Sequence, residues 1–238
     1  MAIIEKIIIL AGGLGTRMRS TLGNTPKPLA PIGGAPFLEY LLRYIAGQDI
    51  FNVIISAGHE FQAIKNIFGD GSLLSTKIEY TFEKNLLGTA GVIKLAEHLI
   101  DTDNFLVVNG DTFLEVNYSM ILRFHRAKRA LATLALVEKK DASRYGSVIL
   151  GPDNRILEFE EKHEDKKSNY INGGLYVFNK RIFNYIADNT VCSLERDILP
   201  SLMSQGLYGF PVKGYFIDIG IPKDYEKAKR ELPLRKNE

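Results

Sequence analysis

The sequence predicts an α/β fold, in which a mixed, mostly parallel sheet is flanked by helices. In the first half of the chain, β-branched apolar runs alternate with segments that repeat apolar residues at helical spacing, and this alternation is typical of parallel sheets. The first apolar run ends directly in glycines, which indicates a central strand that leads into a loop. With 238 residues the chain can bury a large core, so we expect one continuous domain over residues 1–238 with a Rossmann-like sheet.

The expected elements of this first half follow one another closely. Residues 3–11 form the apolar run of the central strand. Further strands are expected at 52–57, 77–83 and 105–109, and helices at 36–46, 60–68, 90–100 and 118–128.

After residue 130 the pattern changes, because the expected strands have shorter connections. These strands lie at 133–137, 147–150, 156–159 and 175–178. They are followed by helices at 181–187 and 194–203, a strand pair over 208–219 and a last helix from Pro222. We therefore expect a smaller, partly antiparallel lobe in residues 112–238 beside the lobe formed by residues 1–111.

Composition excludes several classes of function. Lysine and arginine total 30 against 28 for aspartate and glutamate, so the formal net charge of +2 provides no general basic surface for nucleic acid. Cys192 is the only cysteine, which rules out an intramolecular disulfide and favours a reducing cytoplasm. No apolar stretch is long enough to cross a membrane. We expect a soluble cytoplasmic protein with no nucleic-acid partner and no membrane insertion.

A glycine-rich loop follows the first expected strand. In the run Leu10-Ala11-Gly12-Gly13-Leu14-Gly15-Thr16-Arg17, backbone N–H groups can approach phosphate oxygens without interference from Cβ atoms. Arg17 adds positive charge, as does Lys27 between two prolines, and together they favour a triphosphate. A tight turn without a ligand is the alternative. Met18 in place of a third glycine argues against a dinucleotide site, and the missing Gly-Lys-Ser/Thr ending excludes a P-loop.

Acidic residues far apart in the sequence are candidate metal ligands. Asp111 follows an apolar strand, at the edge where open α/β sheets bind ligands. Asp218 stands in the apolar run Tyr215-Phe216-Ile217-Asp218-Ile219-Gly220, where a carboxylate needs a cation or a charged partner. The pair suits Mg²⁺, which takes one or two carboxylates together with phosphate oxygens and water. A turn residue at Asp111 and an ion pair at Asp218 are the alternatives.

The order of these motifs resembles that of the sugar-1-phosphate nucleotidyltransferases. The motifs are 12–17, Pro26-Lys27-Pro28, Asn109-Gly110-Asp111, Glu161-Lys162, Asn172-Gly173-Gly174 and Asp218. The resemblance implies catalytic roles for Arg17, Lys27 and Asp111, and Mg²⁺ held by Asp111 and Asp218. It implies a nucleotide site at Leu10, Ala11, Gly12, Gly13, Gly15, Thr16, Arg17, Glu83, Gly88, Thr89 and Asp111. It also implies a sugar-phosphate site at Lys27, Tyr145, Gly146, Glu161, Lys162, Asn172 and Gly173.

Shorter segments resemble one branch of this family. Residues 83–91 are similar to the base-recognition loop of guanylyl-transferring members, which implies GTP. Residues 27–32, 145–148 and 215–225 resemble D-glycero-α-D-manno-heptose 1-phosphate guanylyltransferases, whose product, GDP-heptose, serves lipopolysaccharide, capsule or S-layer glycan synthesis. Mannose 1-phosphate or another hexose 1-phosphate is the alternative acceptor. A non-catalytic regulatory subunit and a glycosyltransferase are the alternative functions, and the family pattern allows a homo-oligomer.

Overall fold

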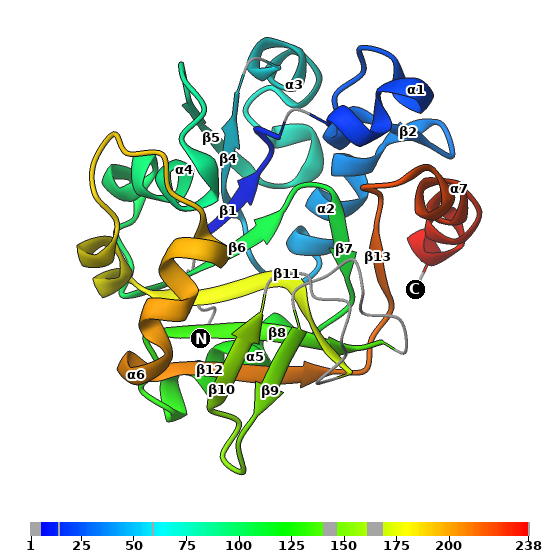
Figure 1. The fold of residues 1–238 in the computed structure, drawn as a ribbon. Coiled ribbons are helices and arrows are strands. Elements are labelled where there is room, and N and C mark those ends of the chain that lie inside the picture. Colours follow the sequence, from blue (N-terminus) through cyan, green and yellow to red (C-terminus); the bar gives the residue numbers. More distant parts are fainter. Residues whose placement is uncertain (1–5, 14, 59, 140–146, 161–168, 238) are drawn as a thin grey trace.

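A computed structural model describes residues 6–13, 15–58, 60–139, 147–160 and 169–237. Its centre is a sheet of nine strands, in which β1 (Lys6–Leu10) lies between two parallel neighbours (Figure 1). The other strands of this sheet are β4 (Asn52–Ala57), β5 (Lys77–Phe82), β6 (Asn104–Asn109), β8 (Ala132–Glu138), β9 (Ser147–Leu150), β10 (Ile156–Glu160), β11 (Tyr170–Asn179) and β12 (Leu207–Val212).

The sheet is parallel at one end and largely antiparallel at the other. β5, β4, β1 and β6 run parallel in that order. β11 then pairs antiparallel with β6, β8 and β9, and β12 lies parallel to β8. The mixed, mostly parallel sheet that the sequence predicts is confirmed: the first half of the chain supplies four parallel strands, and the second half supplies the antiparallel pairs together with the parallel pair of β8 and β12.

Helices cover both faces of the sheet. The α-helices are α1 (Arg19–Leu22), α2 (Phe37–Ala46), α3 (Phe61–Phe68), α4 (Gly88–Leu95), α5 (Tyr118–Ala127), α6 (Met203–Gly206) and α7 (Pro222–Glu231). Short 3-10 segments occur at Thr16–Met18, Lys27–Leu29, Ser72–Leu74, Glu97–Leu99, Lys180–Tyr185, Leu199–Leu202 and Leu232–Asn237, and a π-helical turn at Leu194–Ile198.

Two hydrophobic cores explain why β1 is apolar at every position after Lys6. Ile7 and Ile9 point to one face and pack with residues of α2, α3 and α5. Ile8 points to the other face and packs with residues of α4 and of the segments around Leu194–Ile198. All three isoleucines are fully buried, as expected where successive side chains of a strand alternate between covered faces.

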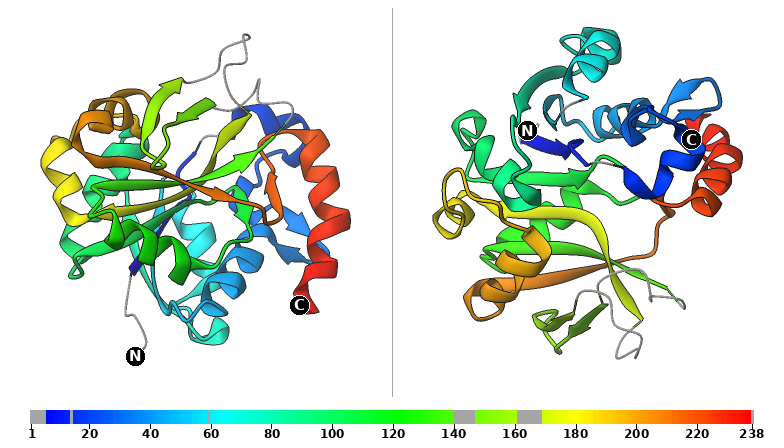
Figure 2. Two further views of the ribbon diagram at one scale, coloured as in Figure 1. Left: turned by 90° about the horizontal axis from the view of Figure 1, so that it is seen from below. Right: turned by 45° about the horizontal axis from the view of Figure 1, so that its top comes forward.

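A third, smaller core positions the end of the chain beside the glycine-rich loop. The hairpin β2 (Pro31–Ile32) and β3 (Ala35–Pro36) packs with α7, and the Tyr225 hydroxyl donates a hydrogen bond to the Pro31 carbonyl at 2.7 Å. In the right view of Figure 2, α7 lies beside α1 and this hairpin. α7 therefore supports the segment that carries Lys27.

The expected strand pair over 208–219 is wrong in its pairing. Both strands form, but β12 joins the large sheet beside β8, whereas β13 (Phe216–Asp218) pairs antiparallel with β7 (Thr112–Leu114). No sequence pattern indicates this pairing, because β7 has only three residues. The expected helix at 194–203 is a π turn followed by a 3-10 turn, since Pro200 has no N–H for an α-helical bond.

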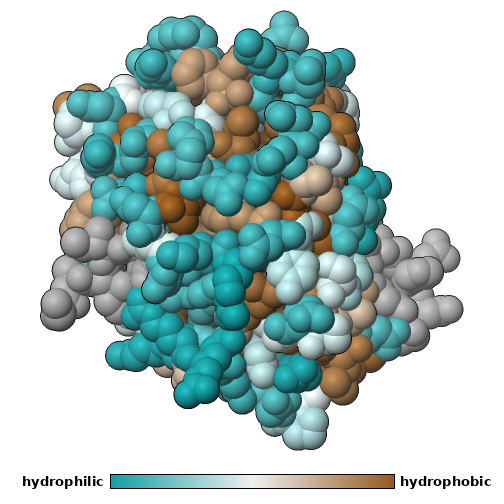
Figure 3. All heavy atoms as spheres, turned by 90° about the vertical axis from the view of Figure 1, so that its left-hand side faces the viewer, coloured by the Kyte–Doolittle hydropathy of each residue, from teal (hydrophilic) through white to brown (hydrophobic). Residues whose placement is uncertain are grey.

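In the described part of the chain, no helix is both long and apolar enough to span a membrane. The face shown in Figure 3 carries mostly hydrophilic side chains, with hydrophobic ones in small separate groups.

Candidate active site

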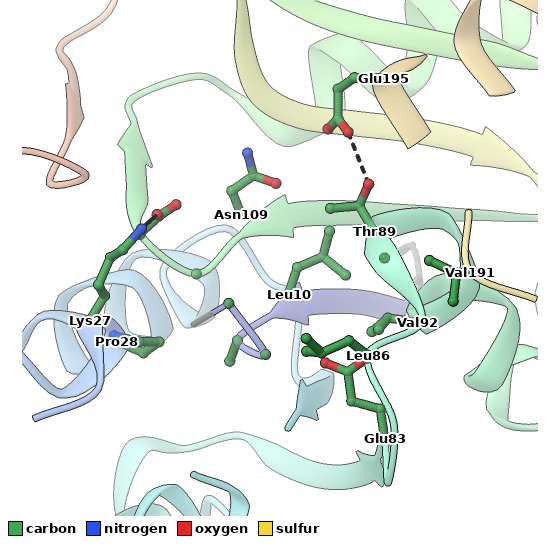
Figure 4. Close-up of a pocket in the computed structure, with 16 residues that line it drawn as sticks. Leu10, Lys27, Pro28, Glu83, Leu86, Thr89, Val92, Asn109, Val191 and Glu195 are labelled. Atoms are coloured by element: carbon green, nitrogen blue, oxygen red, sulfur yellow. Dashed lines mark hydrogen bonds and ion pairs between the residues drawn. The ribbon is translucent and has the colours of Figure 1, made fainter. Parts of the chain in front are cut away.

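A cavity of about 450 Å³ opens at the carboxyl ends of β1 and β6. This is the edge of an open α/β sheet at which ligands bind. Figure 4 shows its two ends, with Lys27 on one side and Glu83, Leu86 and Val92 on the other. Its lining consists of Leu10, Ala11, Gly12, Gly13, Lys27, Pro28, Glu83, Leu86, Gly88, Thr89, Val92, Asn109, Gly110, Asp111, Val191 and Glu195.

The glycine-rich loop forms one wall of the cavity. Its first residue is fixed by a hydrogen bond from the Ala11 N–H to the Ser56 carbonyl at 2.8 Å. A Cβ at Gly12 would collide with the Glu83 carboxylate, so glycine there lets the backbone lie directly against that side chain. Gly15 has a φ of +61°, which again favours glycine. The loop thus turns sharply next to a buried carboxylate.

Lys27 and Asp111 meet at the other end. Lys27 lies in a 3-10 turn that follows Pro26, and its Nζ donates to Asp111 Oδ2 at 2.8 Å. Both side chains are partly shielded, with 13% and 29% of their surfaces exposed. A charge pair that is partly removed from water is stronger than a surface pair. A cation and an acid are therefore held together where the cavity meets the sheet edge.

Asp218 reaches the same place through the small sheet of β7 and β13. Its register partner is Thr112, and the Ile219 N–H donates to the Asp111 carbonyl at 3.0 Å. The Gly220 N–H donates to Asp218 Oδ1 at 2.7 Å. Burial raises the pKa of the Asp218 carboxyl, and the neighbouring Asp111 carboxylate raises it further. The two acids are therefore electrostatic neighbours despite their separation in sequence.

The far end of the cavity carries Glu83 and the start of α4. Only 6% of Glu83 is exposed, and its Oε2 accepts the Leu87 N–H at 3.0 Å. Gly88 has a φ of +71°, and a Cβ there would lie 2.5 Å from the Cys192 carbonyl oxygen. Leu86 and Val191, both substantially exposed, stand at this end of the lining. An apolar slot with a buried carboxylate suits a flat heterocycle that has N–H donors.

Asn172 lies on β11 at an irregularity of the sheet. The register between β11 and β8 shifts between Asn172 and Tyr176, and Gly174 inside this shift has a φ of +70°. Asn172 Nδ2 donates to the Tyr176 hydroxyl at 2.7 Å, and Asn172 Oδ1 accepts the Gly174 N–H at 3.1 Å. Bulges of this kind occur next to active sites, where they redirect a side chain.

The structure brings together most of the residues that the sequence singled out. Nine of the predicted site residues line the cavity: Leu10, Ala11, Gly12, Gly13, Lys27, Glu83, Gly88, Thr89 and Asp111, and the other two residues of the Asn109-Gly110-Asp111 motif line it as well. Gly15 lines an adjoining hollow of about 270 Å³ with Gly13 and Lys27, and Thr16 and Arg17 are exposed beside the loop. Asn172, Gly173 and Asp218 do not line the main cavity. Tyr145, Gly146, Glu161 and Lys162 lie outside the described residues.

Glu195 is a lining residue that sequence reasoning missed. It accepts hydrogen bonds from the Thr89 hydroxyl at 2.9 Å and from the Tyr176 hydroxyl at 3.0 Å. In the sequence it is one acid in the charged run Glu195-Arg196-Asp197, which has the composition of a helix surface. Only the three-dimensional structure reveals that this acid faces inward.

Comparisons with known proteins agree with this geometry. The family described as Nucleotidyl transferase matches residues 6–234. The chain is 42% identical to D-glycero-alpha-D-manno-heptose 1-phosphate guanylyltransferase of Aneurinibacillus thermoaerophilus, over 94% of this chain and 97% of that protein. It is 36% identical to mannose-1-phosphate guanylyltransferase of Mycobacterium tuberculosis, over 94% of this chain but 64% of that protein. The structure is similar to that of HddC from Yersinia pseudotuberculosis complexed with GMP-PN, with a TM-score of 0.84, 34% identity, and coverage of 96% of this chain and 99% of the other.

Proposed function

This chain belongs to the nucleotidyl transferase family, and we propose that it transfers a guanylyl group from GTP to a sugar 1-phosphate, giving a GDP-sugar and pyrophosphate. The acceptor that we propose is D-glycero-α-D-manno-heptose 1-phosphate. One observation carries the proposal: a single cavity holds the Lys27 and Asp111 pair at one end and the buried Glu83 carboxylate at the other. The first end suits phosphates, and the second suits guanine.

The chemistry of the bases supports guanine at Glu83. Guanine carries adjacent N–H donors at N1 and N2, and one carboxylate can accept both in strong, charge-assisted hydrogen bonds. Uracil and thymine offer one N–H between two carbonyl oxygens, which a carboxylate would repel. A buried polar group that loses its partner is costly, so the wrong base is rejected strongly. The similar HddC structure is complexed with GMP-PN, a guanine nucleotide, which agrees with this assignment.

The proposed reaction is an in-line displacement at the α-phosphorus of GTP. A phosphate oxygen of the sugar 1-phosphate forms the new P–O bond, and the bond from the α-phosphorus to the bridging oxygen of pyrophosphate breaks. Because a phosphate monoester has a second pKa of about 6, the nucleophile is already a dianion at neutral pH and needs no general base. Arg17 and Lys27 supply positive charge for the charge that develops on the phosphates. The loop N–H groups next to Gly12 and Gly13 hold the nucleotide in place.

The donor set of the site fits a hard divalent cation. Burial and the neighbouring Asp111 carboxylate both raise the pKa of Asp218, so a positive charge between the two acids would be favourable. We propose that these two residues hold Mg²⁺, whose preferred ligands are one or two carboxylates together with phosphate oxygens. When bound, Mg²⁺ neutralises charge on the phosphates. Lys27 would keep the Asp111 carboxylate oriented when no nucleotide is present.

The choice of heptose rests on the relatives rather than on described contacts. The heptose 1-phosphate enzyme of Aneurinibacillus thermoaerophilus matches nearly the full length of both chains. The mannose 1-phosphate enzyme of Mycobacterium tuberculosis is longer, and it defines the alternative acceptor. We further propose a cytoplasmic location, which the single cysteine favours.

Pyrophosphate release tests the proposal. The enzyme is incubated with Mg²⁺, each of GTP, ATP, UTP and dTTP, and heptose, mannose or glucose 1-phosphate. We expect the highest kcat/KM for GTP with the heptose phosphate. Turnover with another nucleotide and sugar phosphate would support the proposed transfer reaction but show that the enzyme uses different substrates. Nucleotide binding without turnover across the whole panel would indicate a regulatory subunit instead.

A further inference from the structure

The carboxylate of Glu195 is a meeting point of hydroxyl groups from three segments. Its Oε2 accepts from Thr89 at 2.9 Å and from Ser193 at 3.3 Å, and its Oε1 accepts from Tyr176 at 3.0 Å. Glu195 lies in the π-helical turn Leu194–Ile198. The residue lines the main cavity between the wall of α4 and the end of β6 (Figure 4). Its contacts therefore bind the cavity wall to the sheet.

On one side, Glu195 fixes the first turn of α4. Thr89 lines the cavity next to Gly88, and its Oγ1 accepts the Leu194 N–H at 2.7 Å while it donates to Glu195. The same two segments also meet through the Cys192 carbonyl, which accepts the Ala90 N–H at 3.0 Å. Glu195 thus holds the part of α4 that faces the nucleotide.

On the other side, Glu195 fixes Asn172 through Tyr176. Tyr176 is fully buried, and its hydroxyl donates to Glu195 while it accepts from Asn172 Nδ2 at 2.7 Å. Burial and the Glu195 carboxylate raise the pKa of Tyr176 well above its usual value, so the hydroxyl remains a donor throughout the physiological range. The Asn172 amide is then held at both ends, because its Oδ1 accepts the Gly174 N–H. Its orientation is a consequence of the Glu195 contact.

Gly174 connects these contacts to Asn109, near the end of the cavity that carries Lys27 and Asp111. A Cβ at Gly174 would lie 2.9 Å from Asn109 Nδ2, so glycine lets β11 approach Asn109 closely. Asn109 itself lines the cavity two residues before Asp111. The bulge that orients Asn172 is therefore in contact with the site of phosphate chemistry.

We propose that Glu195 is a positioning residue that couples the nucleotide-facing turn of α4 to Asn172 through Tyr176, and so aligns the sugar phosphate with the nucleotide. This inference rests on the nucleotidyl transfer proposed above and on the sugar-phosphate contact that the family resemblance implies for Asn172. It assigns to Glu195 an indirect role, because its carboxylate acts on the acceptor through two other side chains. Breaking the link should therefore change KM for the sugar 1-phosphate and Kd for GTP to different extents, depending on which hydrogen bond is removed.

The substitution Tyr176→Phe cuts the link between Glu195 and Asn172, whereas the hydrogen bond from Thr89 to Glu195 is kept. Tyr176 is fully buried, so the change does not remove a direct contact with either substrate. We expect KM for the sugar 1-phosphate to rise about 10-fold, with Kd for GTP changed by less than about twofold. Tyr185→Phe is the matched control, since Tyr185 is an exposed tyrosine, and it should leave both constants unchanged. A loss of thermal stability without a change in either constant would show a structural role only and overturn the proposal.

The substitution Glu195→Gln cuts the link at its centre. It should raise KM for the sugar phosphate by about 10-fold and also weaken GTP binding through Thr89, whereas Glu97→Gln, at an acid paired with Lys94, should do neither. The double variant Glu195→Gln/Tyr176→Phe should have the sugar-phosphate KM of Glu195→Gln, because both changes break one chain. Additive effects on KM would overturn the proposal. If Tyr176→Phe fails to fold, the Glu195→Gln variant alone tests the proposal. An unchanged KM for the sugar phosphate in Glu195→Gln would then overturn the proposal.

Measurements on the wild-type enzyme distinguish a failure of the proposed function from a failure of the positioning role. Failure of the wild type to release pyrophosphate from GTP and any sugar 1-phosphate would refute the proposed function. An active wild type with unaffected Glu195 and Tyr176 variants would refute only the positioning role.

Discussion

Lys27 Nζ and Asp111 Oδ2 lie 2.8 Å apart although 84 positions separate the two residues in sequence. Lys27 reaches this point from a proline-flanked turn that α7 supports, and Asp111 reaches it from the end of β6. The pair joins the glycine-rich loop to the acidic edge of the sheet. We interpret it as the resting arrangement of a site that exchanges this contact for contacts with phosphates and a divalent cation when the nucleotide binds.

Replacing Asp111 by asparagine should abolish turnover while the protein stays folded. The variant keeps the size of the side chain but removes one charge from the proposed cation site, so we expect kcat to fall by at least about 100-fold. Pyrophosphate release measures activity, and urea denaturation should show only a small change in unfolding free energy, because loss of the ion pair with Lys27 is offset by relief of the repulsion between Asp111 and Asp218. Asp103→Asn, at an exposed acid paired with Lys180, is the control. Near-normal activity of Asp111→Asn would refute the metal assignment.

Replacing Glu83 by glutamine should reduce discrimination between bases. The neutral amide cannot accept both guanine N–H groups, so kcat/KM for GTP should fall by about 100-fold while the value for UTP stays the same or rises. The ratio of the two values for each variant is the measurement. Glu79→Gln alters a partly exposed acid on β5, the strand that ends just before Glu83, and should preserve the ratio. An unchanged GTP to UTP ratio in Glu83→Gln would remove Glu83 from base recognition.

Replacing Gly88 by alanine should weaken GTP binding more than a strained backbone alone explains. Gly88 has a positive φ, and the new Cβ would meet the Cys192 carbonyl oxygen at 2.5 Å. Gly69→Ala is a control with a positive φ but open space around the Cβ, so it isolates the backbone cost of about 1–3 kcal/mol. Isothermal titration with a non-hydrolysable GTP analogue should show at least about 10-fold weaker binding for Gly88→Ala only. Equal affinity of the two variants would show that the turn of α4 does not face the nucleotide.

His125 should make the fold sensitive to acid. It is buried with Nδ1 2.9 Å from the Thr133 hydroxyl, and burial, together with the charge of Arg126, lowers its pKa to about 4. The unfolded chain, with a histidine pKa near 6.5, therefore binds this proton first as the pH falls. Stability from neutral His125 is fully present above pH 6.5 and is lost between pH 6.5 and about 4, by an amount on the order of 3 kcal/mol.

The variant His125→Asn tests this pH dependence. Its amide can keep a hydrogen bond to Thr133 but cannot take up a proton. Unfolding free energies from urea titrations at several pH values should converge with those of the wild type as the pH falls from 6.5 to 4. Curves that stay parallel over this range would show that His125 is not the titrating group.

The sequence predicted those structural and functional features that depend on residues close together in the chain. The run through Ile7, Ile8 and Ile9 predicted a strand buried on both faces, and the glycines after it predicted the loop beside Lys27. Asp111 was identified because a polar motif ends an apolar strand. Such features need only the neighbouring residues, so periodicity and turn chemistry are sufficient to find them.

Long-range pairing was not predictable in the same way. Asp218 reaches Asp111 through β7, which has three residues and no recognisable period, and β12 leaves its sequence neighbour β13 to pair with β8. Glu195 faces inward because of a π-helical turn that a helical pattern does not distinguish. These contacts depend on register between distant strands and on irregular turns, and their energetics come from packing rather than from local propensity.

Transfer of the guanylyl group is best tested by identifying the products. Phosphorus NMR and mass spectrometry are applied to a reaction of the wild-type enzyme with GTP, D-glycero-α-D-manno-heptose 1-phosphate and Mg²⁺. We expect GDP-heptose and pyrophosphate in equal amounts, and the reverse reaction from these two products. Formation of GDP and phosphate, or of pyrophosphate without a GDP-sugar, would contradict transfer of the guanylyl group to the sugar phosphate.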